Sequence, residues 1–342
     1  MSDSAAILVE DLVKIYPGGT RAVAGIHFSV APGQFFGFLG PNGAGKSTTM
    51  KVLSTLLKKT SGRVMVAGHD VDRDPTAVRR SVGFAMQEVG LDDLATGRDF
   101  LVLQGLLYGL SRQEARRRAH ELLELVGLTS VAGKRVGTYS GGMRRRIDLV
   151  AALMHSPPIL FLDEPTAGLD PQSRLAIWEH LEQLNRQGIT IFLTTQLMEE
   201  ADRLCQSIAI IDLGHIVAQG SPRALKEEVG SDVVTLNLGP DGEKGAVAAT
   251  RAEAILKERV GASAVEAPGD AITVRVRDGG AVVPEILHLL KENGISVASL
   301  SVAAPTLDDV FLKHTGRKIR LEAAQGDEVG QTLRPFLGLK KR

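Results

Sequence analysis

The segment GFLGPNGAGKSTTMKVLSTLL, residues 37–57, restricts the possible fold of this chain more than any other stretch. It places the pattern G-x-x-x-x-G-K-S, from Gly40 to Ser47, between an apolar run and a stretch with helical spacing. Glycines let backbone N–H groups close around phosphate oxygens, because no Cβ stands in the way. The start of the following helix adds partial positive charge. The sequence therefore predicts a strand–loop–helix unit that binds a nucleotide.

Two side chains of this loop are predicted to carry its chemistry. The positive charge of Lys46 is expected to bind the β- and γ-phosphates, and the Ser47 hydroxyl is expected to ligate Mg²⁺. The alternative is a glycine-rich turn without a ligand, and the strand before the loop and the helix after it argue against that. The predicted nucleotide-binding residues here are Gly40, Pro41, Asn42, Gly43, Ala44, Gly45, Lys46, Ser47 and Thr48.

A second element is the apolar run PPILFLDEP, residues 157–165, which ends in two carboxylates. Open α/β sheets bind their ligands at the carboxyl ends of parallel strands. Asp163 is therefore predicted to hold Mg²⁺, and Glu164 to orient and deprotonate an attacking water. A solvated acidic pair is the alternative. The adjacent Glu164 favours hydrolysis over phosphate transfer to another acceptor.

A third motif, GTYSGGMRRRIDLVAAL at residues 137–153, contains a serine and two glycines that open a predicted helix. A hydroxyl beside free N–H groups is a second possible anion site, although such a turn is more often a plain helix cap. Either Ser140, Gly141 and Gly142 bind a second anion, or two copies of the chain each lend this turn to the other's nucleotide. Residues 144–146, three arginines, are expected to form a solvated helix face and not a phosphate contact.

The composition limits the remaining possibilities. The 342 residues suggest two domains, and 40 basic residues balance 40 acidic ones, so we expect no nucleic-acid partner. Cys205 is the single cysteine and fits a reducing compartment. The N-terminus has no signal-peptide layout, and no window reaches the roughly 18–20 apolar residues of a membrane helix. We expect a soluble cytoplasmic chain that reaches a membrane only through a partner.

Two domains are expected along the chain. Residues 5–225 alternate apolar runs with helical stretches, which is typical of an α/β domain. Within them, about 91–155 are predicted to form a helical subdomain, with two helices in residues 97–128 that are broken at YGLS. Its apolar side chains form either its own core or a dock for a partner's helix. They include Leu101, Leu106, Leu107 and Tyr108.

The C-terminal part has a different pattern. In residues 230–317, strand-like runs and two helical stretches follow the order β-α-β-β-α-β, which predicts a small ferredoxin-like α+β domain. This domain either binds a small regulator or widens a dimer interface. Residues 318–342 are expected to form a flexible tail.

Together, the motifs GPNGAGKST, FAMQE, YSGGM, ILFLDEP and AGLD resemble the nucleotide-binding subunit of an ABC transporter over residues 5–225. The resemblance implies a P-loop ATPase domain, with a mixed sheet and a helical subdomain, before the α+β domain. It also implies a head-to-tail dimer, with two ATP molecules held between the phosphate loop of one copy and the YSGGM signature of the other. Both sites would then hydrolyse ATP with Mg²⁺.

The resemblance also implies roles for single residues. Tyr16 would stack on adenine, unless it is an ordinary strand-end tyrosine, and Gln87 would contact Mg²⁺ and the attacking water. Ser140, Gly141 and Gly142 would clamp the γ-phosphate in trans. Asp170 would connect the two sites, alone or together with a role as a helix cap.

The sequence departs from the commonest family form at Tyr139 and Met143 in the signature and at Gln196, where a histidine is usual. These departures, and APTLDDVFLKHTGR at residues 304–317, resemble the daunorubicin/doxorubicin-resistance exporters. That branch implies a peripheral ATPase subunit on the cytoplasmic face of the membrane, which powers export of a drug-like or lipid-like compound through a separate permease. The alternatives are an uptake-system ATPase and a nucleoprotein-remodelling ATPase. A single phosphate loop without heptads disfavours the latter.

Gln196 is predicted to be catalytic together with Glu164 and Lys46. Glutamine keeps a donor and an acceptor but cannot titrate near neutral pH. Positioning and charge stabilisation dominate phosphoryl transfer, so hydrolysis does not require a titratable group here. The sequence leaves open a normal ATPase with Glu164 as base, a slow ATPase, or a glutamine that only packs in its loop.

Overall fold

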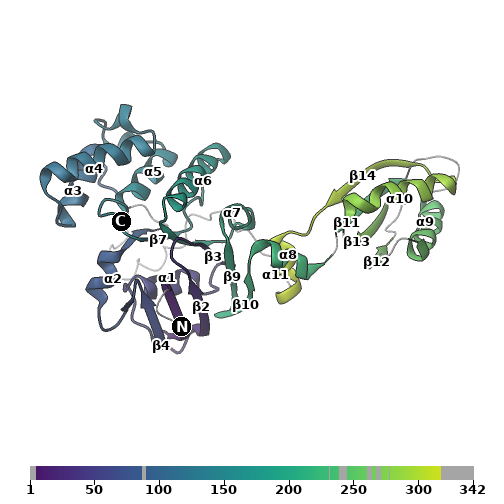
Figure 1. Ribbon diagram of the computed structural model, residues 1–342, viewed down its shortest axis with the longest axis horizontal. Coiled ribbons are helices and arrows are strands. Elements are labelled where there is room, and N and C mark those ends of the chain that lie inside the picture. The colour runs from purple at the N-terminus through teal and green to yellow at the C-terminus, as the bar shows by residue number, and fades with distance from the viewer. Residues whose placement is uncertain are drawn as a thin grey trace, which may run out of the picture. The chain divides into compact units, whose positions relative to one another are not determined.

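The computed structural model describes residues 5–86, 90–230, 232–238, 245–259, 264–266, 271–276 and 278–316 (Figure 1). The described chain divides into two compact units, the first ending at Val217 and the second beginning at Ala218. Gln87 and the predicted tail, residues 318–342, lie outside the described residues, and the domain limits inferred from the sequence stay predictions.

Six strands form the main sheet: β3 (Phe35–Leu39), β6 (Val82–Ala85), β7 (Ile159–Asp163), β8 (Thr190–Thr195), β9 (Ser207–Asp212) and β10 (His215–Gly220). Their spatial order is β10-β9-β3-β8-β7-β6, and the five strands from β9 to β6 pair in parallel. Every residue of β3, β7 and β8 is buried, as expected for parallel strands that are covered on both faces.

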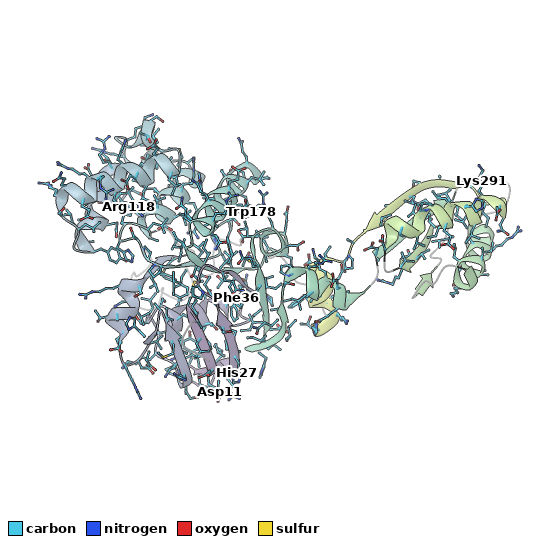
Figure 2. The ribbon with its side chains drawn as sticks, in the orientation of Figure 1. Asp11, His27, Phe36, Arg118, Trp178 and Lys291 are labelled. Atoms are coloured by element: carbon cyan, nitrogen blue, oxygen red, sulfur yellow. The ribbon has the colours of Figure 1, made fainter. Side chains whose placement is uncertain are left out.

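A second, antiparallel sheet contains β1 (Ile7–Ile15), β2 (Arg21–Val30), β4 (Ser61–Val66) and β5 (His69–Asp70), in the order β2-β1-β4-β5. Helix α1 (Lys46–Leu53) contacts strands of both sheets. One hydrophobic core joins the sheets, and its aromatic centre has ring centroids 5.5–5.8 Å apart. These rings belong to Phe28, Phe36, Phe38, Phe161 and Phe192, and Figure 2 labels Phe36.

Helices α3 (Gly97–Leu107), α4 (Arg112–Leu125) and α5 (Gly141–Ala151) gather at the end of the first unit opposite the antiparallel sheet (Figure 1). The predicted break between α3 and α4 is present, because Gly109 has φ +88° and Ser111 caps α4 by accepting from Glu114 N. Two 3₁₀ turns, at Thr129–Val131 and Val136–Thr138, lead into α5. The remaining helices of this unit are α2 (Pro75–Ser81), α6 (Pro171–Arg186) and α7 (Met198–Leu204).

The second unit contains β11 (Asp232–Leu238), α9 (Gly245–Arg259), β12 (Ala264–Glu266), β13 (Ala271–Val276), α10 (Gly279–Glu292) and β14 (Val297–Ala303). Its antiparallel sheet has the order β12-β13-β11-β14, and its core includes Val234, Leu256 and Leu290. The predicted ferredoxin-like arrangement is confirmed.

Two helices of the second unit were missed from the sequence. Helices α8 (Pro222–Val229) and α11 (Leu307–Thr315) contact each other, and Lys313 Nζ donates to Glu228 O. Their caps were visible: Ser221 accepts from Ala224 N, and Thr306 forms a capping box with Asp309. Hydrophobic periodicity was the weaker signal, because both helices are short.

We expect Phe192→Ala to lower the unfolding free energy of the first unit by about 3–5 kcal/mol, because it leaves a cavity at the centre of the aromatic core. Urea unfolding followed by the fluorescence of Trp178, the only tryptophan, measures this (Figure 2). Leu213→Ala is the control, since that side chain is 70% exposed and should contribute less than about 0.5 kcal/mol. A loss near the control value for Phe192→Ala would contradict a shared core.

Candidate active site

The phosphate loop, residues 40–45, connects β3 to α1, and its backbone requires glycine. Gly43 and Gly45 have φ +78° and +112°, in the left-handed region. A Cβ on Gly40 would lie 2.2 Å from Ile211 O, and one on Gly45 would lie 2.5 Å from Ala22 O. The loop therefore encloses a small pocket of about 140 Å³, lined by Ala22, Asn42, Gly43, Gly45, Lys46, Ser47, Thr48 and Glu164.

Lys46 places its ammonium group inside this pocket. Its Nζ donates to Gly40 O at 2.8 Å and to Pro41 O at 3.1 Å, and lies 3.3 Å from Glu164 Oε1. Both side chains of this ion pair are buried. Burial lowers the pKa of Lys46, and the Glu164 carboxylate opposes that shift. A buried cation held at the phosphate loop suits the phosphates of a nucleotide.

Ser47 and Asp163 meet beside the lysine although 116 residues separate them. Ser47 Oγ donates to Asp163 Oδ1 at 3.3 Å, and Thr194 Oγ1 donates to the same oxygen. Hydroxyl and carboxylate oxygens are suitable ligands for Mg²⁺. The described residues contain no cluster of three His, Cys, Asp or Glu side chains that could hold a metal. Magnesium here would therefore also need phosphate oxygens and water, which is its usual coordination beside a nucleotide.

Glu164 and Gln196 follow the ends of β7 and β8. Glu164 has φ +46°, and its N–H donates to Thr194 O at 3.0 Å. Gln196 Oε1 is buried and has no hydrogen-bond partner among the described residues. A buried amide oxygen is costly without a donor, which marks Gln196 as a candidate for a functional contact.

Of the remaining candidate residues that the structure describes, Tyr16 lies beside the phosphate loop, whereas the others lie at the starts of helices. Tyr16 lies beside the loop, with its hydroxyl 3.2 Å from Thr48 Oγ1 and Lys14 Nζ 5.3 Å from its ring centroid. Ser140 is the N-cap of α5 and accepts from Met143 N at 3.3 Å, and Asp170 is the N-cap of α6 and accepts from Ser173 N at 2.9 Å. The turn Ser140–Gly142 does not line the Lys46 pocket.

Comparison with known proteins identifies the family. Residues 23–167 match the ABC transporter family, and residues 220–315 match the C-terminal domain of DrrA1-3-like ATP-binding proteins. The chain is 42% identical to the daunorubicin resistance ATP-binding protein DrrA3 of Streptomyces coeruleorubidus, over 95% of this chain and 100% of that protein. The chain belongs to the DrrA-like ATP-binding proteins of ABC transporters.

Two further similarities support the same family. The linearmycin resistance ATP-binding protein LnrL of Bacillus subtilis is 39% identical, over 91% of this chain and 98% of LnrL. A solved ABC cassette, described as dimeric and post-hydrolysis with ADP and Pi, is 27% identical with a TM-score of 0.58 and covers 63% of this chain and 98% of its own. The predicted family, the fold class and ATP hydrolysis are confirmed.

In this DrrA-like ATPase, the prediction of a solvated arginine face on α5 is wrong. Arg145 is only 5% exposed and donates to backbone carbonyls beyond its own helix. Arg144 pairs with Asp93 at 2.5 Å, and Arg146 donates to Val126 O at 2.8 Å. Each of the three side chains therefore binds a different partner within the protein.

Sequence reasoning also missed a buried glutamate behind the site. Glu200 is fully buried on α7 and accepts from Thr166 Oγ1 at 2.7 Å and from Trp178 Nε1 at 2.9 Å. Burial raises the pKa of this carboxyl. The contacts join the segment after Glu164 to the segment after Gln196. In the sequence, Glu200 resembles the acidic residues that commonly occupy the first turn of a helix.

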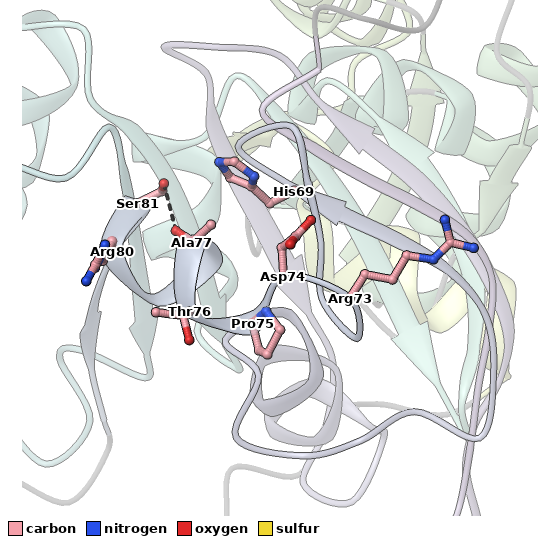
Figure 3. Close-up of a pocket in the computed structure, with 8 residues that line it drawn as sticks. All are labelled: His69, Arg73, Asp74, Pro75, Thr76, Ala77, Arg80 and Ser81. Carbon is pink, nitrogen blue, oxygen red and sulfur yellow. Dashed lines mark hydrogen bonds between the residues drawn. The ribbon is translucent and has the colours of Figure 1, made fainter.

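A larger surface pocket, of about 550 Å³, lies against α2 and has a polar lining (Figure 3). Figure 3 shows Arg73 and Arg80 pointing in opposite directions, so their charges do not converge on one anion. His69 and Asp74 also line it. The Lys46 pocket is smaller but contains a fixed cation and the Glu164 carboxylate, with Asp163 next to it through Ser47.

We expect Gln196→His to retain or raise ATPase activity, because histidine also supplies a donor at this position. Gln196→Ala should lower kcat on the order of 100-fold, by analogy with the loss of one transition-state donor. Steady-state hydrolysis with a separate nucleotide-binding assay tests both variants. A collapse of hydrolysis in Gln196→His with unchanged ATP affinity would show that the amide has a role that histidine cannot fill.

Proposed function

We propose that this chain powers an ABC exporter as a head-to-tail dimer, with each ATP between the Lys46 loop of one copy and the Ser140–Gly142 turn of the other. The observation that carries the proposal is the convergence of Lys46, Ser47 and Glu164 on one pocket, with Asp163 accepting a hydrogen bond from Ser47. The proposed cargo is a drug-like or lipid-like compound, which crosses the membrane through a separate permease. The names of the drug-resistance relatives support this direction of transport.

Within one site, each side chain has a distinct proposed task. Lys46 binds the β- and γ-phosphates, and Ser47 and Asp163 hold Mg²⁺, with Gln87 as a further contact. Magnesium, when bound, neutralises charge on the phosphate oxygens. Glu164 orients the attacking water and takes its proton. The Gln196 amide donates to the γ-phosphate, while its free Oε1 accepts from the water.

The second half of the site is proposed to come from the twin chain. Ser140 and Gly141 are exposed at the start of α5, where the first N–H groups of a helix lack partners within it. Together with Gly142 they offer an anion site that is separate from the chain's own phosphate loop. The dimeric state of the solved cassette supports this arrangement. Asp170, exposed at the start of α6, would face the twin, and Tyr16 would stack on adenine.

A groove of about 550 Å³ is the proposed dock for the permease. It is lined by Ser54, Leu56, Thr76, Arg79, Arg80, Val82, Phe84, Leu107, Tyr108 and Gly109. Leu107 is 72% exposed and Leu56 is 58% exposed, whereas Leu101 is fully buried and belongs to the subdomain core. The described helices include none long and apolar enough to span a membrane. A cytoplasmic helix of the permease would cover these apolar side chains and hold the ATPase at the membrane's inner face.

We expect Glu164→Gln to reduce ATP turnover by at least about 100-fold while ATP binding is retained, because only the base is removed. The variant should accumulate as a dimer with MgATP, which size-exclusion chromatography coupled to light scattering measures. Turnover close to that of the parent would refute the assignment of the base. A variant that binds ATP but stays monomeric would refute the shared site.

We expect Leu107→Glu to abolish recovery of a polytopic membrane protein when the chain is used as bait in detergent-solubilised membranes. A buried charge at the centre of the dock has no partner and opposes binding. Basal ATPase activity should stay within about twofold of the parent, since Leu107 does not line the nucleotide pocket. Leu213→Glu, at another exposed leucine, is the matched control. Recovery of ribosomes or DNA in place of a permease would overturn the transport proposal.

A further inference from the structure

Helix α5 sends one side chain, Arg145, into the interior beside the catalytic carboxylates. Its Nε donates to Pro165 O at 2.7 Å, and its Nη2 donates to Asp163 O at 3.1 Å. Its Nη1 donates to Met86 O and, at 3.2 Å, to Asp148 Oδ2. The guanidinium group therefore joins α5 to the backbone at the ends of both β6 and β7.

Two of these carbonyl groups belong to the residues on either side of Glu164. Glu164 has φ +46°, which is an uncommon conformation for a residue other than glycine. The peptide plane before it is fixed twice, by Arg145 at Asp163 O and by the bond from Glu164 N to Thr194 O at 3.0 Å. Ala167 N donates to Glu164 O at 3.2 Å and fixes the plane after it. Such a conformation persists only where several contacts determine it.

We propose that Arg145 is a positioning residue, which holds the backbone of Glu164 in the left-handed conformation and so aims its carboxylate into the Lys46 pocket. Arg145 does not line that pocket, so it acts through Glu164 and does not touch the phosphate. The inference deepens the proposed function, because it takes Glu164 as the base named there.

The geometry requires an arginine at this position. A planar guanidinium presents five N–H donors in a fixed fork, whereas a lysine ammonium is one point charge. Only the fork reaches carbonyl groups from two strands at once. The buried cation is balanced on its own helix by Asp148. Burial raises the pKa of Asp148 to about 6 and Arg145 opposes that shift, so the pair is ionised above that pH.

The same helix connects Arg145 with the other proposed half-site. Ser140 caps α5, and Arg145 lies just over one turn further along it. In the proposed dimer, the first turn of α5 would contact the twin's nucleotide while Arg145 holds the chain's own Glu164. A shift of α5 on nucleotide binding would therefore act on the backbone of the base in the opposite site.

The test compares Arg145→Met, which removes every donor, with Arg145→Lys, which keeps the charge. We expect kcat for ATP to fall roughly 10- to 100-fold in Arg145→Met, because a small displacement of a catalytic group has effects of this size. Arg145→Lys should fall by a smaller but clear factor. KM for ATP and the dissociation constant of a fluorescent nucleotide should stay within about threefold of the parent, because the phosphate loop is intact.

Arg118→Met is the matched control. Arg118, labelled in Figure 2, also donates to a backbone carbonyl, Leu153 O at 3.4 Å, but lies on α4 and has no contact with Glu164. Its kcat should match the parent. If Arg145→Met fails to fold, Arg145→Lys decides, and a folded lysine variant with the parent kcat overturns the inference. Equal losses in kcat and nucleotide affinity also overturn it, because they indicate a general structural role.

The Glu164→Gln variant separates this inference from the proposed function. If Glu164→Gln is inactive and dimeric with MgATP but the Arg145 variants are fully active, only the inference fails. If Glu164→Gln hydrolyses ATP like the parent, the base assignment fails and the inference fails with it.

Discussion

The parallel pairing of β3, β8 and β7 is the constraint on which the active site depends. Its register places Leu39 opposite Thr195 and Asp163 opposite Thr194, so the three strands end at the same edge. The phosphate loop begins directly after β3. Glu164 directly follows β7, and Gln196 directly follows β8. They converge because the strands are buried and in register, although up to 156 residues separate them in the chain. The aromatic core is built on the same strands, so its packing fixes the edge at which the candidate residues lie.

Local sequence patterns predicted the parts of the site that depend on backbone shape and strand ends. The glycine spacing around Lys46, the carboxylates after an apolar run and the caps at Ser140 and Asp170 all rest on interactions within a few residues. The β-α-β-β-α-β order of the second unit was also predictable from local patterns, because each strand or helix has its own hydrophobic periodicity. Helices α8 and α11 are too short for a clear hydrophobic period, and so the sequence pattern did not predict them. Their capping residues were the stronger signal.

The parts that sequence could not supply depend on partners far along the chain. Three consecutive arginines on a helix resemble a solvated face, and nothing local tells that Arg145 reaches carbonyl groups at residues 86, 163 and 165. Tyr139 is similar: its hydroxyl donates to Val131 O, and its ring requires a glycine at residue 97, where a Cβ would lie 2.3 Å from that hydroxyl. Buried polar groups need specific acceptors, and only the folded chain identifies them.

The arrangement of β6 would connect the proposed permease dock with the proposed base, Glu164. Val82 and Phe84 line the proposed dock, and β6 ends one residue before Met86, whose carbonyl accepts from Arg145. His155 is also part of this region, because it stacks on Tyr108 with 3.8 Å between ring centroids and its Nε2 lies 3.0 Å from Val82 O. A helix seated in the groove would press on β6, and β6 shares a guanidinium with the backbone of Glu164. The dock and the base are thus linked through one short strand and one buried arginine. With a permease helix in the proposed dock, transport and hydrolysis would therefore be coupled without any contact between the permease and the nucleotide.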